Sequence, residues 1–169
     1  MTPEYYRTLY DYNAWANRRV LDACAGLTME QFTKELGSSF PTIRDTLTHI
    51  VWGQWLWLER WNGRSHGPER PWPEFADVAS LRRECEKVDQ DLVRFVAGLK
   101  GTDLERVYDY KTSAGKPSSN PLWQMLSHLA NHSTYHRGQV TTLLRQIGAS
   151  AISTDLIVFF REVAARASA

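Results

Sequence analysis

The sequence predicts an all-α protein, a four-helix bundle with a short extra helix at the C-terminal end. Apolar residues recur every three or four positions through four long segments, which is typical of amphipathic helices. No stretch of alternating polar and apolar residues is long enough for a substantial sheet, and the connections are modest. With 169 residues, we expect a single domain spanning 1–169.

The first two helices have recognisable boundaries. Thr2 and Pro3 form a cap and first-turn pair, which predicts a helix over about 3–25. A second helix begins after the serines near Ser39 and ends at Asn62. Its inward-facing residues are predicted to be Ile43, Leu47, Ile50, Gln54, Trp57 and Trp61.

The middle of the chain mixes a loop, a helix and an irregular region. Residues 62–76 are rich in proline and glycine and are predicted to form a loop. A third helix is expected from Asp77 to a stop at Gly101. Beyond it, 107–110 could be extended, and 113–120 is predicted to be loop.

The fourth helix has the strongest boundary signals. Asn120 is its expected cap, Pro121 its first residue and Gly148 its stop. A short helix after Thr154 and Asp155 completes the predicted fold.

Charge and composition exclude several classes of protein. Twenty Lys and Arg against 19 Asp and Glu give a net charge of +1, so no strong field attracts nucleic acid. The longest apolar run, 50–58, is too short to cross a membrane. Cys24 and Cys85 are expected to be free thiols, and no signal peptide is recognised, so we expect a cytoplasmic protein.

Three histidines share the fourth helix at spacings of four residues: His128, His132 and His136. On a helical projection His136 lies on the apolar stripe, His132 about 60° from its centre and His128 about 100° away. His132 and His136 can therefore direct two imidazoles at one ion. The competing interpretation is that each histidine is simply half-buried and hydrogen-bonded, which would leave several imidazole nitrogens needing separate partners.

A third ligand is expected from the second helix. His49 is the candidate, and Gly53, one turn later, would let another group approach closely. Asp45 could orient His49, although it could equally be a surface charge. His66 lies in the predicted loop and is expected to be exposed. Three neutral nitrogens leave open positions on an ion, as in catalytic sites.

Three segments resemble the DinB/YfiT-like family of metal-dependent enzymes, which fold as four-helix bundles. The most specific is HLANHSTYHRGQVTTLLRQIG, residues 128–148, with its His-x-x-x-His-Arg-Gly-Gln element. Residues 46–63 and 10–21 also match, as does Thr154-Asp155. The resemblance spans nearly the whole chain, although 64–120 matches loosely.

The resemblance implies a divalent metal held by His49, His132 and His136, in agreement with the helical projection. Zinc or nickel is the expected ion, with iron or manganese as alternatives. Relatives include transferases and isomerases that use low-molecular-weight thiols such as bacillithiol or mycothiol. We therefore expect a metal-dependent enzyme that transfers a thiol to a small electrophile, or a hydrolase. The alternative is a non-catalytic, stress-associated bundle that binds a metal or ligand.

Two features leave more than one interpretation. Arg137 is expected to reach a neighbouring helix or an anionic group of a substrate. Trp52 and Trp55 lie opposite the inward-facing side of the second helix, which predicts a two-fold homodimer packed through that helix. Alternatively, the loop 62–76 covers these tryptophans, or they line a substrate cavity.

Overall fold

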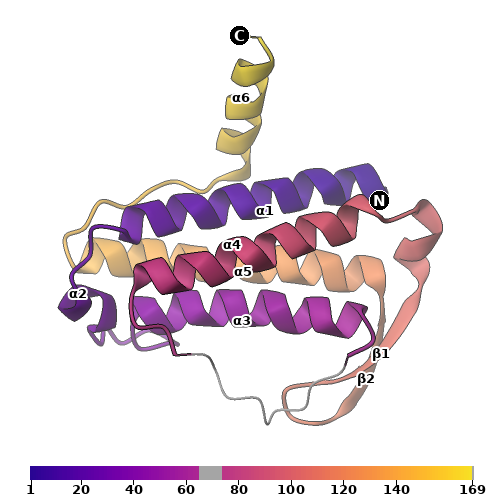
Figure 1. Ribbon diagram of the computed structural model, residues 1–169, viewed down its shortest axis with the longest axis horizontal. Helices are drawn as coiled ribbons and strands as arrows, with labels where there is room; N and C mark the ends of the chain where they lie inside the picture. Colours follow the sequence, from indigo (N-terminus) through magenta and orange to yellow (C-terminus); the bar gives the residue numbers. More distant parts are fainter. Residues whose placement is uncertain (65–73, 169) are drawn as a thin grey trace.

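Four long helices lie side by side in the computed structural model, which describes residues 1–64 and 74–168 (Figure 1). They are α1 (Pro3–Cys24), α3 (Ile43–Trp61), α4 (Val78–Ala97) and α5 (Leu122–Gln146). Helices α1 and α3 each pack against both α4 and α5. This arrangement confirms the predicted four-helix bundle, and it makes α3 and α5 direct neighbours.

Shorter elements join and extend the bundle. They are α2 (Met29–Thr33), a 3₁₀ helix (Gly101–Glu105), the antiparallel strands β1 (Val107–Lys111) and β2 (Pro117–Pro121), and α6 (Leu156–Ala167). Helix α2 was not predicted, although Thr28 and Gln31 form a capping box at its start. Strand β2 includes 117–120, which were predicted to be loop.

The predicted cap is correct at the start of α1 and wrong at α5, while α4 begins directly after Asp77, where its start was expected. Thr2 accepts a hydrogen bond from the Tyr5 amide, and Asp77 accepts one from the Ser80 amide. Asn120 does not cap α5, because it pairs with Tyr108 in the hairpin and is held in extended conformation.

Two helix boundaries differ from the prediction. Pro121 precedes α5 rather than beginning it, since it still belongs to the hairpin. Helix α4 ends at Ala97 rather than near Gly101, because the Gly98 amide closes the last turn on the Phe95 carbonyl.

The core contains a cluster of hydrogen-bonded polar side chains, which we call the core polar network. Its members come from all four long helices and are at most 7% exposed: Asn13, Asn17, Gln54, Asp89, Ser133 and Arg137. Polar groups buried in this way must find partners within the protein. On α1, Asn13 and Asn17 are buried while Tyr5 is 51% exposed, so the buried side of this helix does not follow hydrophobicity alone.

Arg137 and Asp89 carry the network's two charges. The Arg137 guanidinium donates to Asn13 Oδ1 at 2.7 Å and to Asn17 Oδ1 at 2.8 Å. The Asp89 carboxylate accepts from Gln54 Nε2 at 2.7 Å and from Asn17 Nδ2 at 2.9 Å. Asn17 therefore links the two charged groups.

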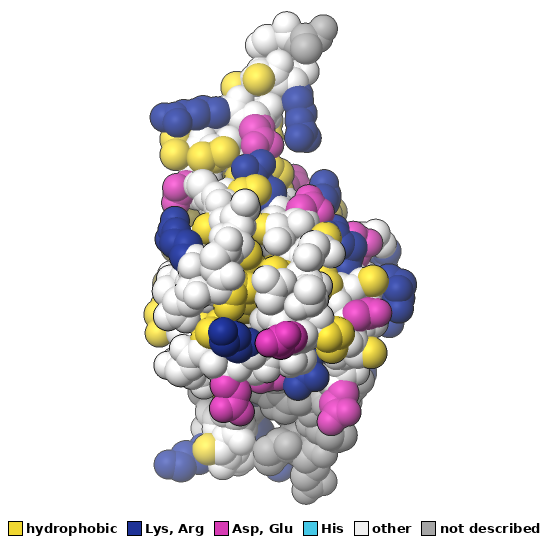
Figure 2. Space-filling model, turned by 90° about the vertical axis from the view of Figure 1, so that its left-hand side faces the viewer, with side chains coloured by type: hydrophobic (Ala, Val, Ile, Leu, Met, Phe, Trp, Pro, Cys, Tyr) yellow, Lys and Arg dark blue, Asp and Glu magenta, His cyan; other side chains and the backbone are white. Residues whose placement is uncertain are grey.

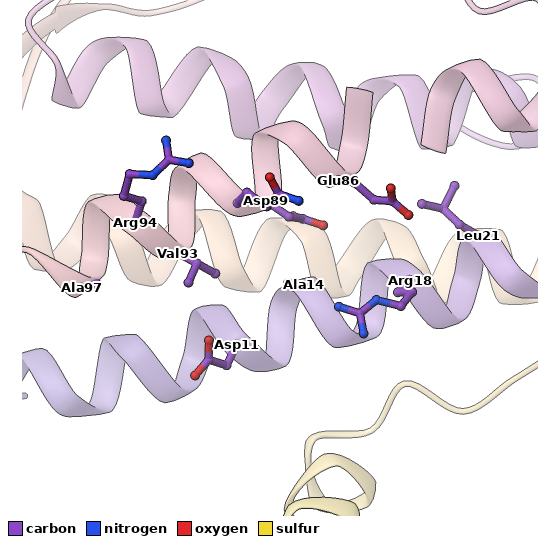
Figure 3. A pocket seen from close by; sticks show the side chains of 10 residues that line it. Asp11, Ala14, Arg18, Leu21, Glu86, Asp89, Val93, Arg94 and Ala97 are labelled. Atoms are coloured by element: carbon purple, nitrogen blue, oxygen red, sulfur yellow. The ribbon is translucent and has the colours of Figure 1, made fainter. Parts of the chain in front are cut away.

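Asp89 is where the network approaches the surface. It lines a groove of about 570 Å³ between α1 and α4, where Arg18 and Arg94 also lie (Figure 3). Burial raises the pKa of the Asp89 carboxyl to about 6, although its hydrogen bonds and Arg137 oppose the shift.

Helix α6 stands away from the bundle (Figure 1). Its Phe159 packs edge-on against Tyr12 and Trp15, and its Glu162 accepts from Trp15 Nε1 at 2.9 Å. Hydrophobic side chains remain visible among basic ones on this protruding part (Figure 2). In the described part of the chain, no helix has the length and apolar character needed to cross a membrane.

The raised pKa of Asp89 predicts a pH dependence with a definite sign. The folded protein retains a proton near pH 5 that the unfolded chain loses near pH 3.8, so this group makes the protein less stable as the pH rises from 4 to 6. Asp89→Asn keeps an Oδ1 acceptor and cannot ionise. Its unfolding free energy minus that of the wild type should increase by at most about 3 kcal/mol over this range and then level off.

Urea unfolding between pH 4 and 8, with a chelator present, measures this difference. A difference that stays flat or decreases as the pH rises would contradict the buried position of the Asp89 carboxyl.

Candidate metal centre

Three imidazoles converge where α3 meets α5. His49 comes from the first half of α3, while His132 and His136 come from successive turns of α5. Each offers one ring nitrogen, and these nitrogens all lie within 4.8 Å of one another. The Nε2 atoms of His49 and His132 are 2.9 Å apart. The structure thus brings together the three residues that the sequence predicted as ligands.

The three rings lie close to the spacing that a shared ion requires. Ring centroids are 4.4 Å apart for His49 and His136, 4.4 Å for His132 and His136, and 4.8 Å for His49 and His132. Two nitrogens bound to one zinc ion at about 2.1 Å can lie up to about 4.2 Å apart. The three nitrogens lie within 4.8 Å of one another, so the widest-spaced rings would have to move closer together to share an ion.

Gly53 allows His132 to reach this position. A Cβ atom added at Gly53 would lie 3.2 Å from His132 Cε1 and 3.7 Å from its Nδ1. The imidazole therefore lies against the backbone of α3. This contact confirms the expectation that a glycine one turn after His49 admits a close approach.

All three rings are neutral lone-pair donors at pH 7. Burial, reinforced by the neighbouring histidines, lowers the pKa of His49 to about 3 and that of His132 to about 4. Burial also lowers the pKa of His136. Since neutral imidazole is the form that binds metals, the donor set suits a cation such as zinc.

One buried nitrogen also fits this interpretation. His132 Nδ1 is buried and has no hydrogen-bond partner among the described residues. A histidine held only by its own hydrogen bonds would be expected to satisfy both nitrogens. The ring is instead held by its contact with α3 and by the facing nitrogen of His49.

Comparison with known proteins agrees with this fold. The model of the DinB family matches residues 1–165. The chain belongs to the DinB family. It is 27% identical over 152 residues to protein DinB of Bacillus subtilis, covering 87% of this chain and 88% of that protein. A crystal structure of a DinB-like protein from Bacillus cereus has a TM-score of 0.72 and 25% identity, over 90% of this chain and 97% of that one.

Two residues outside the trio hold its rings in place in this DinB-family chain. His136 Nδ1 lies 2.7 Å from Gln139 Oε1, which places a hydrogen on Nδ1 and leaves Nε2 free to bind. Phe40 stacks on His49, with centroids 4.1 Å apart and ring planes at 25°. The spacing of three residues from His136 to Gln139 is visible in the sequence. Phe40 lies in a loop and gives no such signal.

His128 lies beside the trio and outside it. Its side chain is exposed, and its ring centroid is 5.7 Å from that of His132 and 5.1 Å from that of Trp57. Asp45 pairs with Arg44 at 3.5 Å, so the orienting role considered for it is not seen among the described residues. His66 lies outside the described residues.

Arg137 points away from the trio and into the core. Its side chain is fully buried and reaches Asn13 and Asn17 of α1. The expectation that it contacts a neighbouring helix is confirmed. The alternative, contact with an anionic group of a substrate, is not compatible with its burial.

The contact at Gly53 predicts a selective effect on metal binding. In Gly53→Ala the new methyl group should displace the His132 ring and lower metal affinity by about 10–100-fold. Alanine is also the better helix former by about 1 kcal/mol, so the metal-free protein should not become much less stable. Competition with a chromogenic chelator measures the affinity.

Gly138→Ala is the matched control, because a Cβ there meets nothing within 4 Å. Its metal affinity should equal that of the wild type. Equal affinity in both alanine variants would show that the Gly53 contact does not position His132 for binding.

Proposed function

We propose that this DinB-family protein binds one divalent metal ion through His49, His132 and His136 and acts as a metal-dependent enzyme. The favoured reaction is transfer of a low-molecular-weight thiol to a small electrophile. The observation that carries the proposal is the convergence of three neutral imidazoles from two helices. Imidazole ligands suit zinc and nickel, with iron and manganese as alternatives.

Each residue of the site has a definite part in this proposal. When bound, the ion supplies a Lewis acid that lowers the pKa of a thiol or a water molecule. The three histidines contribute no negative charge, so they do not offset the charge of the cation. Gln139 fixes the tautomer of His136, and Phe40 shields one face of His49 from water.

The number of ligands favours a catalytic over a structural site. Catalytic zinc sites usually have three protein ligands and an open position, whereas structural sites have four. The histidine trio is a group of three within residues 1–64 and 74–168. A hydrolase acting through bound water, and a non-catalytic metal-binding bundle, remain the alternative functions.

Loss of any ligand should remove the metal. His49→Ala, His132→Ala and His136→Ala should each lower the affinity by more than the roughly 10–100-fold typical of losing an outer partner. Elemental analysis after gentle purification should give one ion per wild-type chain. The matched control is His128→Ala, which should retain it. Full occupancy in all three ligand variants would contradict the proposed site.

A screen of thiols and electrophiles then distinguishes an enzyme from a binding protein. Conjugation that stops on chelation and returns with the metal supports the transferase. Metal binding without turnover of any thiol or water-dependent substrate supports the non-catalytic alternative.

We also propose that the chain forms a two-fold homodimer. Leu156, Ile157, Phe160 and Val163 of α6 are 38–55% exposed. A groove of about 440 Å³ between α1 and α5 opens beside the base of α6, so each copy could receive the α6 of the other. The predicted interface on α3 is less available, because Leu56 is buried and Trp55 packs against the core.

This assembly should depend on the exposed face of α6. Light scattering at micromolar concentration should give twice the chain mass of 19.4 kDa for the wild type. Phe160→Glu should give the mass of one chain, because a carboxylate would be buried without a partner. Met29→Glu, on the exposed side of α2, is the control and should remain dimeric. A wild-type mass of one chain would contradict the dimer.

A further inference from the structure

We infer that the core polar network positions the metal ligands, with Gln54, Ser133 and Arg137 as positioning residues. The inference rests on the proposed metal site. Gln54 follows Gly53, which contacts His132, while Ser133 follows His132 and Arg137 follows His136. The network therefore lies directly behind the site on both ligand-bearing helices.

Helix geometry explains this adjacency. Successive residues of an α-helix point about 100° apart, so one residue can face the site while the next faces the bundle centre. In each of these three pairs the first residue lines the site. The second residue, Gln54, Ser133 or Arg137, is fully buried and hydrogen-bonded in the core. A rotation or slide of α5 that displaced His132 and His136 would also displace Ser133 and Arg137.

Gln54 is the point where the helices are joined. Its Oε1 accepts from Asn17 at 2.8 Å, from Asn13 at 3.1 Å and from Ser133 at 3.3 Å. Its Nε2 donates to Asp89 at 2.7 Å. One side chain of α3 thus contacts α1, α4 and α5, and the bond to Ser133 ties α3 to α5 beside His132.

Arg137 fixes the other end of this connection. Its Nη1 bonds to Asn13 and Asn17 of α1, and its Nη2 bonds to Thr134 at 2.9 Å. A buried guanidinium that lost these acceptors would be strongly destabilised. Because the planar guanidinium has fixed donor directions, it restricts the rotation of α5 at the residue next to His136.

Apolar side chains could fill the same volume and hold the helices together. Buried polar groups replaced by well-packed apolar ones often leave stability unchanged or increase it. Apolar contacts tolerate small slides, however, whereas hydrogen bonds weaken steeply with distance and angle. The distinctive contribution of the network is thus to fix the register between α3 and α5. A change in that register should change the coordination geometry of a bound metal ion.

Binding of Co²⁺, followed by visible absorption, tests this inference with the full chain. Gln54→Met should lower the Co²⁺ affinity by about 10–100-fold and change the band positions and intensities. Ser133→Ala removes only the direct bond to α5, so it should shift both in the same direction by less. Leu92→Ala, in the apolar part of α4, should lose stability and retain the wild-type affinity and spectrum.

The outcomes separate this inference from the proposed function. Wild-type protein that binds no Co²⁺ would overturn both. Wild-type binding with unchanged affinity and spectrum in Gln54→Met and Ser133→Ala would overturn the positioning role alone. If Gln54→Met does not fold, the result for Ser133→Ala tests the positioning role. In that variant Gln54 keeps its hydrogen bonds from Asn13 and Asn17 and loses only the one from Ser133. Urea unfolding of each metal-free variant gives its free energy of unfolding. Comparing these values with the Co²⁺ affinities shows whether affinity falls with stability in general or only when the network is changed.

Discussion

The close approach of α3 and α5 is the constraint on which the site depends. Neither helix carries all three histidines, so their nitrogens meet only if the two backbones are near enough and in register. At Gly53 the absence of a side chain lets the His132 ring lie against α3. Behind that contact, Gln54 and Ser133 join the same two helices. Gly53, Gln54 and Ser133 are all buried.

Electrostatics gives the site its chemical character. The trio contains no carboxylate, and burial lowers the pKa of all three histidines, so the rings are neutral at pH 7. A divalent ion held by neutral ligands keeps its full charge and favours an anion, such as a thiolate, as its next ligand. The core polar network keeps the two charges of Asp89 and Arg137 close to one another through Asn17. The fold thus encloses charge within the core and leaves the ligand trio uncharged.

Sequence periodicity predicted the bundle and the pairing of His132 with His136, because both depend on helical spacing. His49 was instead expected as the histidine of the second helix, in agreement with the family resemblance. His132 and His136 share a face through their separation of four residues, and their burial follows the predicted order, with His136 most buried and His128 exposed. The predicted start of α5 was one residue too early, because pairing in the hairpin holds Asn120 and Pro121 in extended conformation.

The core polar network and the stacking of Phe40 could not be read from the sequence, for a related reason. Asparagine and glutamine are ordinarily surface residues, and their burial here depends on partners from other helices. Only the three-dimensional arrangement supplies those partners. Gln139 is the exception, since its spacing from His136 on the same helix makes the contact readable in advance.

Anomalous diffraction from crystals grown with zinc would show whether the three histidines share one ion. One strong peak per chain is expected within about 2.3 Å of a ring nitrogen of His49, His132 and His136 together. A map with no peak among these rings, or with zinc bound only elsewhere, would contradict this expectation.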